Sequence, residues 1–595
     1  MAKIIKKSFP WFLILSLIVA VVFSFNLNFK NSEVKADSAD TSVTVGNTAP
    51  SLGTPAENPA SYGTTPTNIG ANVTFESTST DPNSDNWYLA VCKTNVINPG
   101  TGGGAPTCDT ASTWCVSTST VSGAKATCVE EAEGVAESNV WYAFACDAAS
   151  SSQACSASSQ GTSDSGSPFK VNHIPAFTVY ADDGPKAPAV TMTWTTTASD
   201  SDTDTANDTV SLYVCKSNAF VASTLTCTDG AWCSDTAKSS NPTCGATTLR
   251  PDGDYAAYGF VVDSHGLEAS GSPHATDSTP TVSNATPSIT ASSISVLDTD
   301  EAGNMTLTTE QAVTTGFKVK FTVVDANSCV IKGGVAGTNN EIASSFINLR
   351  MSEKATTSCD ESGEYDANDC YPDASASWDP TCTQDADTCT GVTDTDAAWT
   401  CTFPIQYHAD ATVTGAPKAS YNWVAAVKAT DDDTADTGLV DSTTGSNEMD
   451  KFMSYDLTTA TIVYGTVSAN GDSSEKTTTV EATGNVGLDE NISGGTSGSK
   501  GLCTGSYPTC SGSYIATDQQ NYNLTTAQGW GGTGHADLAY TPAEAELNCA
   551  KTTTTGSPAT ANTYWYLHVP TGQAAGSYTG QNTIEGKINN ETYGS

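Results

Sequence analysis

Two acidic loops in the first half of the sequence hold the side chains best suited to chemistry. The loops, "STDPNSDNW" and "SDSDTDTAND", alternate acidic or amide residues with others: Asp81, Asn83, Asp85, Asp200, Asp202 and Asp204. This alternation can place several oxygens on one face of a loop, and oxygens are the ligands that Ca²⁺ prefers. These six residues are therefore candidate Ca²⁺ ligands, and no other cofactor is expected. The alternative, that both loops are solvated acidic turns, stays open.

Known metal and catalytic motifs are missing from the sequence. The segment from Asp200 to Ser211 lacks the glycine and glutamate of an EF-hand, and the acidic run "DDDTAD" (Asp431, Asp432, Asp433, Asp436) is a weaker candidate of the same kind. The patterns C-x-x-C, H-E-x-x-H and G-x-S-x-G are absent, and the six histidines are dispersed. We expect no enzyme, with no catalytic and no cofactor-binding residue.

The elements that must position these loops are β-strands. Short runs such as "NVTFEST", "VSLYVCK" and "FKVKFTVVD" alternate apolar and polar residues, which is typical of half-buried strands. Only "TPAEAELNCA" shows a weak helical pattern. The sequence therefore predicts an all-β chain.

The strands belong to a repeated unit. Leu89–Cys115 and Leu212–Cys233 share a Val-Cys-Lys-(Thr/Ser)-Asn opening and a closing Trp-Cys. Three segments, "VGNTAPS", "VNHIPA" and "VSNATPS", share an Asn-x-x-Pro pattern after a valine, around Pro50, Pro175 and Pro287. A proline suits the first position of a strand after a linker, so we interpret these segments as domain junctions. Repetition at this period indicates an array of similar sandwiches.

The length of 595 residues fits about four domains at about 150 residues each. We expect a signal peptide at 1–36, a linker at 37–46, repeat 1 at 47–171, repeat 2 at 172–283, a third domain with a cysteine-rich insertion at 284–455, and a C-terminal β-sandwich at 456–595. Lys3, Lys6 and Lys7 precede an apolar run from Pro10 to Phe25, as in an export signal. An uncleaved membrane anchor is the alternative.

The charge narrows the range of partners. The chain carries 65 acidic and 24 basic residues, for a net charge of −41. Nucleic acid and anionic membrane surfaces are themselves negative and are not expected as partners, so the membrane is contacted only through the N-terminal segment if that is uncleaved. Seven Asn-x-Ser/Thr sequons make glycosylation a candidate modification: Asn72, Asn207, Asn284, Asn304, Asn491, Asn523 and Asn590.

Nineteen cysteines in an exported chain indicate disulfides. Repeat 2 lacks counterparts of Cys146 and Cys155, so these two are expected to pair. Three connectivities fit the other four cysteines of each repeat. We expect neighbours to pair, because each bond would then close a polar excursion that cannot order itself: Cys92 with Cys108, Cys115 with Cys128, Cys215 with Cys227, and Cys233 with Cys244.

The remaining cysteines are less constrained. Cys503 and Cys510 are close enough in "LCTGSYPTC" to pair, which leaves Cys549 either as a buried thiol or for an intermolecular bond. The pairing among the six cysteines of the third domain cannot be deduced: Cys329, Cys359, Cys370, Cys382, Cys389 and Cys401.

These residues carry a resemblance. The segments "TDPNSDNWYLAVCKTN" and "SDTDTANDTVSLYVCKSN", with the junctions, resemble tandem immunoglobulin-like or fibronectin-III-like domains of bacterial cell-surface proteins, which are largely uncharacterised. "TGNVGLDENISG" and "VPTGQAAGSYTG" resemble a β-sandwich of prokaryotic envelope proteins, in which a Gly-Asn turn joins two strands and a final G-x-Y-x-G strand closes the sheet. The resemblance implies tandem Ig-like β-sandwiches.

The leading interpretation is an exported structural or adhesion protein, a rod of disulfide-stapled Ig-like domains at the cell surface. Its partners would be envelope components, or glycans or proteins on a host or neighbouring cell, bound through loop ends and sheet edges. One alternative is a self-assembling S-layer-type lattice subunit. A further alternative is a secreted carbohydrate-binding or carbohydrate-degrading protein whose sandwiches are accessory modules.

Overall fold

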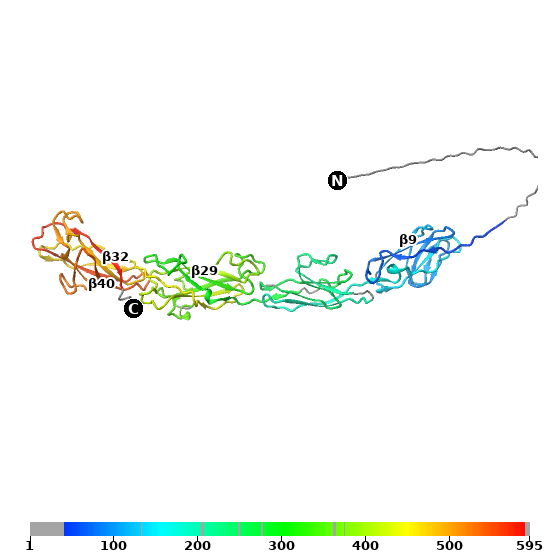
Figure 1. Cartoon of the computed structure of the whole chain (residues 1–595), viewed down its shortest axis with the longest axis horizontal. Coiled ribbons are helices and arrows are strands. Elements are labelled where there is room, and N and C mark those ends of the chain that lie inside the picture. The colour runs from blue at the N-terminus through cyan, green and yellow to red at the C-terminus, as the bar shows by residue number, and fades with distance from the viewer. Residues whose placement is uncertain are drawn as a thin grey trace, which may run out of the picture. The chain divides into compact units, whose positions relative to one another are not determined.

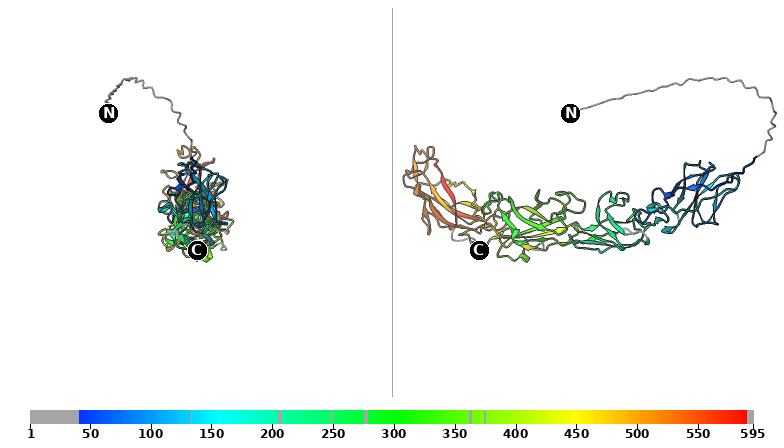
Figure 2. Two further views of the ribbon diagram at one scale, coloured as in Figure 1. Left: turned by 90° about the vertical axis from the view of Figure 1, so that its right-hand side faces the viewer. Right: turned by 45° about the vertical axis from the view of Figure 1, so that its right-hand side comes forward.

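The computed structural model describes residues 41–589 apart from 133, 204–207, 248–249, 275–277, 361–363 and 374. Within these residues the chain consists of strands and loops without an α-helix, as all views show (Figure 1; Figure 2). Four 3₁₀ turns interrupt the loops: Ser163–Ser165, Ala291–Ser293, Thr356–Ser358 and Thr517–Gln519. The predicted all-β class is confirmed.

The predicted signal peptide, 1–36, lies outside the described residues. Among those that are described, no helix is long and apolar enough to cross a membrane.

The chain forms two compact units. The first comprises the residues up to Pro55, Phe75–Val129 and Trp141–Gly161, and the second comprises Ala56–Thr74, Glu130–Val140 and the chain from Thr162 onward. Repeat 1, as predicted at 47–171, contributes segments to both units.

The first unit is organised around β5, the strand with the Val-Cys-Lys motif. β5 pairs on one side with β11 and on the other with β8, β6 pairs with β7, and β4 pairs with β1 and β9. Phe75 and Trp141 are buried in edge-to-face contact, and Trp87 is also buried. The bounds are β1 (Ser51–Leu52), β4 (Asn72–Thr80), β5 (Trp87–Cys92), β6 (Ile97–Asn98), β7 (Thr107–Cys108), β8 (Thr113–Val116), β9 (Lys125–Glu131) and β11 (Tyr142–Asp147).

Repeat 2 is a sandwich of two three-stranded sheets, β13-β14-β19 and β18-β15-β21. Met192 and Trp194 of β14 share one buried apolar cluster with Leu212 of β15 and Val261 of β21. Every second residue of β14 is buried, because side chains alternate between the two faces of a strand. The bounds are β13 (Ala176–Asp182), β14 (Met192–Ser199), β15 (Val210–Cys215), β18 (Ala231–Lys238), β19 (Thr243–Ala246) and β21 (Tyr258–Asp263).

Short strands complete this part of the second unit. β3, β10 and β12 form a small sheet, and β16 pairs with β17 and β20 with β22. The bounds are β2 (Ala56–Glu57), β3 (Thr67–Asn68), β10 (Ser138–Asn139), β12 (Phe169–Asn172), β16 (Phe220–Val221), β17 (Thr226–Cys227), β20 (Gly253–Asp254) and β22 (Thr281–Val282).

The sequence repeat is also a structural repeat. Tyr142 of β11 lies opposite Cys92 of β5, and Tyr258 of β21 lies opposite Cys215 of β15. The central strands of the two repeats therefore pair in the same register.

The lysine and tryptophan of the shared motif contact each other in both repeats. The Lys93 ammonium lies 4.1 Å from the centroid of the Trp114 ring, and that of Lys216 lies 4.6 Å from Trp232. A cation over an aromatic face contributes about 0.5–1 kcal/mol at an exposed site. The two residue types recur together because they form this contact.

The third domain is a larger sandwich. One sheet has the order β23-β25-β29-β28, with β24 also on β25, and the other has the order β27-β26-β30-β31. Phe317 and Phe403 from the first sheet and Leu349 and Trp423 from the second share one buried cluster. The bounds are β23 (Ser288–Ile289), β24 (Ser295–Leu297), β25 (Thr314–Val324), β26 (Ile342–Met351), β27 (Cys370–Pro372), β28 (Thr381–Gln384), β29 (Asp396–Ile405), β30 (Trp423–Asp431) and β31 (Val440–Asp441).

The C-terminal region has three sheets. Their orders are β32-β34-β41-β38-β39, with β33 also on β41, β40-β35-β43 and β37-β36-β42. Trp565 and Tyr522 of the first sheet pack with Ile492 and Ala545 of the second. The bounds are β32 (Tyr455–Thr459), β33 (Gly471–Asp472), β34 (Lys476–Ala482), β35 (Leu488–Gly494), β36 (Lys500–Cys503), β37 (Tyr514–Ala516), β38 (Gln520–Asn523), β39 (Ala536–Asp537), β40 (Ala543–Cys549), β41 (Thr560–Val569), β42 (Thr579–Gly580) and β43 (Asn582–Ile588).

Two local sequences in this region have clear structural reasons. The Gly-Asn turn between β34 and β35 reaches the end of the third domain, where Asn485 accepts a hydrogen bond from the Phe452 N–H at 2.6 Å and a Cβ on Gly484 would lie 2.1 Å from the Phe452 oxygen. The weak helical pattern of "TPAEAELNCA" is wrong, because β40 pairs with β35 and buries Ala545 and Cys549.

Nine disulfides occur among the described residues. Every predicted pair is bonded: Cys92–Cys108, Cys115–Cys128, Cys146–Cys155, Cys215–Cys227, Cys233–Cys244 and Cys503–Cys510. The third domain adds Cys329–Cys389, Cys359–Cys370 and Cys382–Cys401. Cys549 is a free, buried thiol.

The loop length that each disulfide closes predicts how much it stabilises its sandwich. Cys329–Cys389 spans 60 residues and Cys503–Cys510 spans 7. Replacing both cysteines by alanine should cost about 4 kcal/mol for the long loop and about 2 kcal/mol for the short one, since a longer loop frees more unfolded-chain entropy. Hydrogen exchange of strand amides in the whole chain measures both values. Equal losses, or a larger loss for the short loop, would contradict this account.

Candidate functional site

One hydrogen bond recurs at all three Asn-x-x-Pro segments. The side-chain amide of the junction asparagine donates to an aspartate that ends strand β11, β21 or β30. The three bonds are Asn47 Nδ2 to Asp147 Oδ2 at 2.8 Å, Asn172 to Asp263 at 2.9 Å, and Asn284 to Asp431 at 3.0 Å. Because these aspartates are at most 5% exposed, each junction anchors to a buried carboxylate.

The two predicted acidic loops lie at the first two of these junctions, those of Asn47 and Asn172. Asp81 directly follows β4 and Asp200 directly follows β14. The residue after each junction asparagine donates its N–H to the third residue of the loop, from Thr48 to Asn83 at 2.9 Å and from His173 to Asp202 at 2.6 Å. Four of the six candidate residues are thus placed at junctions. Asp85 donates its N–H to Asp81 at 3.2 Å, and Asp204 lies outside the described residues.

A third loop of the same build was missed by the sequence analysis. Asp325 directly follows β25, and Asn327 accepts the N–H of Ala285 at 2.5 Å. In each loop the first aspartate also accepts the N–H of the third residue, at 2.7 Å for Asp81, 2.9 Å for Asp200 and 2.8 Å for Asp325. The sequence feature that could have revealed this loop is the short Asp-x-Asn pattern directly after a strand. It was missed because the segment has no run of acidic residues.

Each junction leaves two buried oxygens without a hydrogen-bond partner among the described residues. These atoms are Oδ1 of the asparagine and Oδ2 of the first loop aspartate in all three copies. We name the groups cluster 1 (Asn47, Asp81, Asn83, Asp147), cluster 2 (Asn172, Asp200, Asp202, Asp208, Asp263) and cluster 3 (Asn284, Asp325, Asn327, Asp431, with Asp252, Glu341 and Asp432). An unpaired buried polar atom costs about 1–3 kcal/mol, so its repetition requires a physical reason.

Cluster 2 includes three carboxylates in close proximity. Asp200, Asp202 and Asp208 each offer an oxygen within 4.8 Å of the others. Asp202 binds the His173 ring at 2.9 Å and Asp208 binds the His265 ring at 2.8 Å. Burial, together with the nearby carboxylates of Asp208 and Asp202, raises the pKa of Asp200 to about 6. Asp200 is therefore the carboxylate of this group without a histidine partner.

Cluster 3 is the most strongly acidic. Asp252, Glu341 and Asp432 each offer an oxygen within 4.8 Å of the others. Glu341 is 0% exposed, and neither of its oxygens has a hydrogen-bond partner. Burial, followed by repulsion from the carboxylates of Asp432 and Asp252, raises the pKa of Glu341 to about 8.

A comparable acidic group in the second unit includes its own cation. The buried Lys551 ammonium donates to the Asn368 side chain and the His408 carbonyl, both at 2.7 Å, and pairs with Asp410 at 2.9 Å. Burial and the Lys551 charge lower the pKa of His408 to about 4, so that its ring is neutral.

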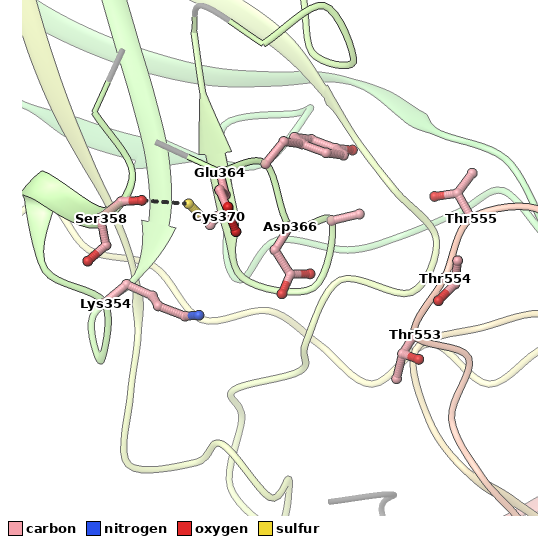
Figure 3. Close-up of a pocket in the computed structure, with 10 residues that line it drawn as sticks. Lys354, Ser358, Glu364, Asp366, Cys370, Thr553, Thr554 and Thr555 are labelled. Carbon is pink, nitrogen blue, oxygen red and sulfur yellow. Dashed lines mark hydrogen bonds between the residues drawn. The ribbon is translucent and has the colours of Figure 1, made fainter. Parts of the chain in front are cut away.

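The neighbouring hollow is lined mainly by polar side chains. Thr553, Thr554 and Thr555 face Lys354, Glu364 and Asp366 across about 660 Å³ (Figure 3). The Cys370 sulfur lies at its wall, 3.7 Å from the Ser358 carbonyl oxygen (Figure 3).

A serine, a histidine and an aspartate also meet in repeat 2, but they do not form a catalytic triad. The Ser264 hydroxyl lies 3.0 Å and the His265 Nδ1 lies 2.8 Å from the same oxygen of Asp208. In a triad, the two nitrogens of the histidine contact the serine and the carboxylate separately. Here Asp208 orders a turn.

The donor atoms of the clusters determine what they can bind. Clusters 1, 2 and 3 offer carboxylate and carboxamide oxygens without a thiolate. Oxygen-only sets suit hard divalent cations such as Ca²⁺ and do not suit the sulfur and nitrogen sites of zinc.

Comparisons with known proteins give little beyond the fold. No protein-family model and no curated protein matches the chain. A marsupial T cell receptor structure aligns at 8% identity over 63% of this chain and 95% of its own, with a TM-score of 0.23. The chicken CNTN1 FN1-FN3 domains align at 8% identity over 62% of this chain and 92% of their own, with a TM-score of 0.18. The chain's own paired sheets and their shared buried clusters show the tandem Ig-like or fibronectin-III-like sandwiches.

Removing the internal cation should be costly. Lys551→Met would leave the Asp410 carboxylate buried without its counter-charge, and breaking such a pair costs about 3–5 kcal/mol. Lys418→Met is the matched control, because the Lys418 side chain is 36% exposed and its partner Glu353 lies at an exposed position, and exposed pairs contribute about 0–1 kcal/mol. Hydrogen exchange of β41 and β29 reads the loss of stability. Equal effects of the two variants would contradict the assignment.

Proposed function

We propose that the chain is an exported, non-enzymatic structural and adhesion protein that presents disulfide-closed Ig-like sandwiches at the cell surface. The observation that carries this proposal is the cysteine pattern. Of 19 cysteines, the nine disulfides use 18 and leave only Cys549 free. Disulfides of this density form and persist outside the reducing cytosol.

The composition supports the same function. Only 15% of the residues are charged, and these are mostly acidic, so Ser, Thr, Asn and Gly supply much of the polar surface. A strongly negative protein stays soluble and avoids nucleic acid. Sandwich loops are the usual place for recognition, so partners such as surface glycans or proteins would be bound there.

The thiol count gives a direct prediction. In the protein purified from its natural source, denaturation without a reductant should expose a single alkylatable thiol, that of Cys549. The folded protein should resist iodoacetamide at neutral pH, because Cys549 is 1% exposed and burial raises the pKa of its thiol to about 11. Mass spectrometry of alkylated peptides measures both states. Many free thiols in the denatured natural protein would contradict export.

The location and assembly are tested on cells and in solution. Antibodies against the chain should label intact source cells, and protease added outside those cells should remove the label. Analytical ultracentrifugation of residues 37–595 should show a monomer, and beads coated with it should bind cell surfaces. Label confined to the cytosol would contradict the proposal, and spontaneous growth into ordered sheets would favour the S-layer-type alternative.

A further inference from the structure

Cluster 3 combines three segments that lie far apart in the sequence. Asp252 precedes β20 of repeat 2, Glu341 precedes β26 and Asp432 follows β30 of the third domain. One carboxylate oxygen of each residue lies within 4.8 Å of the other two, although like charges repel each other. At this short distance the repulsion is strong, so the convergence opposes folding unless something compensates it.

A second, independent observation points to a ligand. Glu341 is completely buried, and both of its oxygens are without a hydrogen-bond donor. Asp325, which is 2% exposed, has one such oxygen, and so does Asn284. Buried charges in proteins are normally paired or coordinate metals. Cluster 3 therefore contains four buried oxygens without a hydrogen-bond partner among the described residues, two on Glu341 and one each on Asp325 and Asn284.

The basic side chains of the same segments do not supply that partner. The Lys332 ammonium donates to the Asp254 carbonyl and lies 4.3 Å from the centroid of the Tyr255 ring. The Arg250 guanidinium donates to the Ala326 carbonyl at 3.2 Å. The charged groups that act on Glu341 are all carboxylates: Asp432, Asp252, Asp325 and Asp431. Without a bound cation Glu341 holds a proton at neutral pH, since its pKa is about 8. A cation from solution can replace that proton, and Asp432 lies at an exposed position of the cluster.

The unpaired oxygens recur at all three junctions, so they are not a peculiarity of one loop. The same two atoms, the asparagine Oδ1 and the aspartate Oδ2, are without partners in clusters 1, 2 and 3. The group around Lys551 has a similar crowd of oxygens, but there an ammonium lies among them. None of the residues named in clusters 1, 2 and 3 is a lysine or arginine.

We propose that cluster 3 is a Ca²⁺ site in which Asp252, Glu341 and Asp432 supply the carboxylates and Asp325 and Asn284 supply further oxygens. Ca²⁺ takes six to eight oxygens in flexible geometry, which suits a mixed carboxylate and carboxamide set. The ion joins the loop before β20 to the third domain. This inference goes beyond the proposed function and does not depend on it.

Calorimetric titration of the full mature chain, stripped with EDTA and titrated with CaCl₂ at neutral pH, tests the site. We expect a Kd of about 10⁻⁴–10⁻³ M, as in extracellular Ca²⁺ modules. Glu341→Gln, which keeps the shape and removes the charge, should abolish one binding equivalent or weaken it by about tenfold or more. Glu490→Gln is the matched control, because Glu490 is also buried with an unpaired oxygen but lies outside the cluster.

Hydrogen exchange with and without Ca²⁺ gives a second readout. Ca²⁺ should protect the segments 250–254, 325–327 and 431–433 in the wild type and in Glu490→Gln, and should leave them unprotected in Glu341→Gln. If Glu341→Gln does not fold, Asp432→Asn at an exposed position serves for the same comparison. No Ca²⁺ binding by the wild type, or equal binding by the cluster 3 variant, would overturn the proposal.

Discussion

A buried carboxylate must find a proton, a hydrogen-bond donor or a cation, and this constraint decides how the junctions are built. Asp147, Asp263 and Asp431 solve it with an asparagine amide, which is why an asparagine stands at every junction. Asp410 solves it with Lys551. Among the residues that the structure describes, Glu341 has neither an amide donor nor an ammonium partner, and the inferred cation would take the place of the proton that it must otherwise hold.

The sandwiches that the junctions connect are held together by core packing and by disulfides. Apolar side chains on alternate strand positions fill the cores, while long polar excursions between strands bury too little surface to order themselves. Disulfides close these excursions instead, as Cys92–Cys108 does around β6 and β7. Core packing and covalent closure together order the sandwiches, and the acidic loops directly follow the strands β4, β14 and β25.

Much of this could be predicted from the sequence where a repeat offered a comparison. The paired loss of Cys146 and Cys155 from repeat 2 indicated their bond, and the shared motif indicated the common register of β5 and β15. The third domain has no such copy, so Cys329–Cys389 could not be deduced. Glu341 was missed for a similar reason: its neighbours come from distant segments, and no local pattern marks a residue whose role depends on tertiary burial.

The most direct test is a diffraction experiment on crystals of residues 37–595 grown with CaCl₂, with anomalous data collected at long wavelength, where calcium scatters strongly. The account predicts an anomalous peak in cluster 3, within about 2.3–2.6 Å of oxygens from Glu341 and Asp325. A well-ordered cluster 3 without such a peak, in which a proton is shared between Glu341 and Asp432 or water satisfies both, would contradict it.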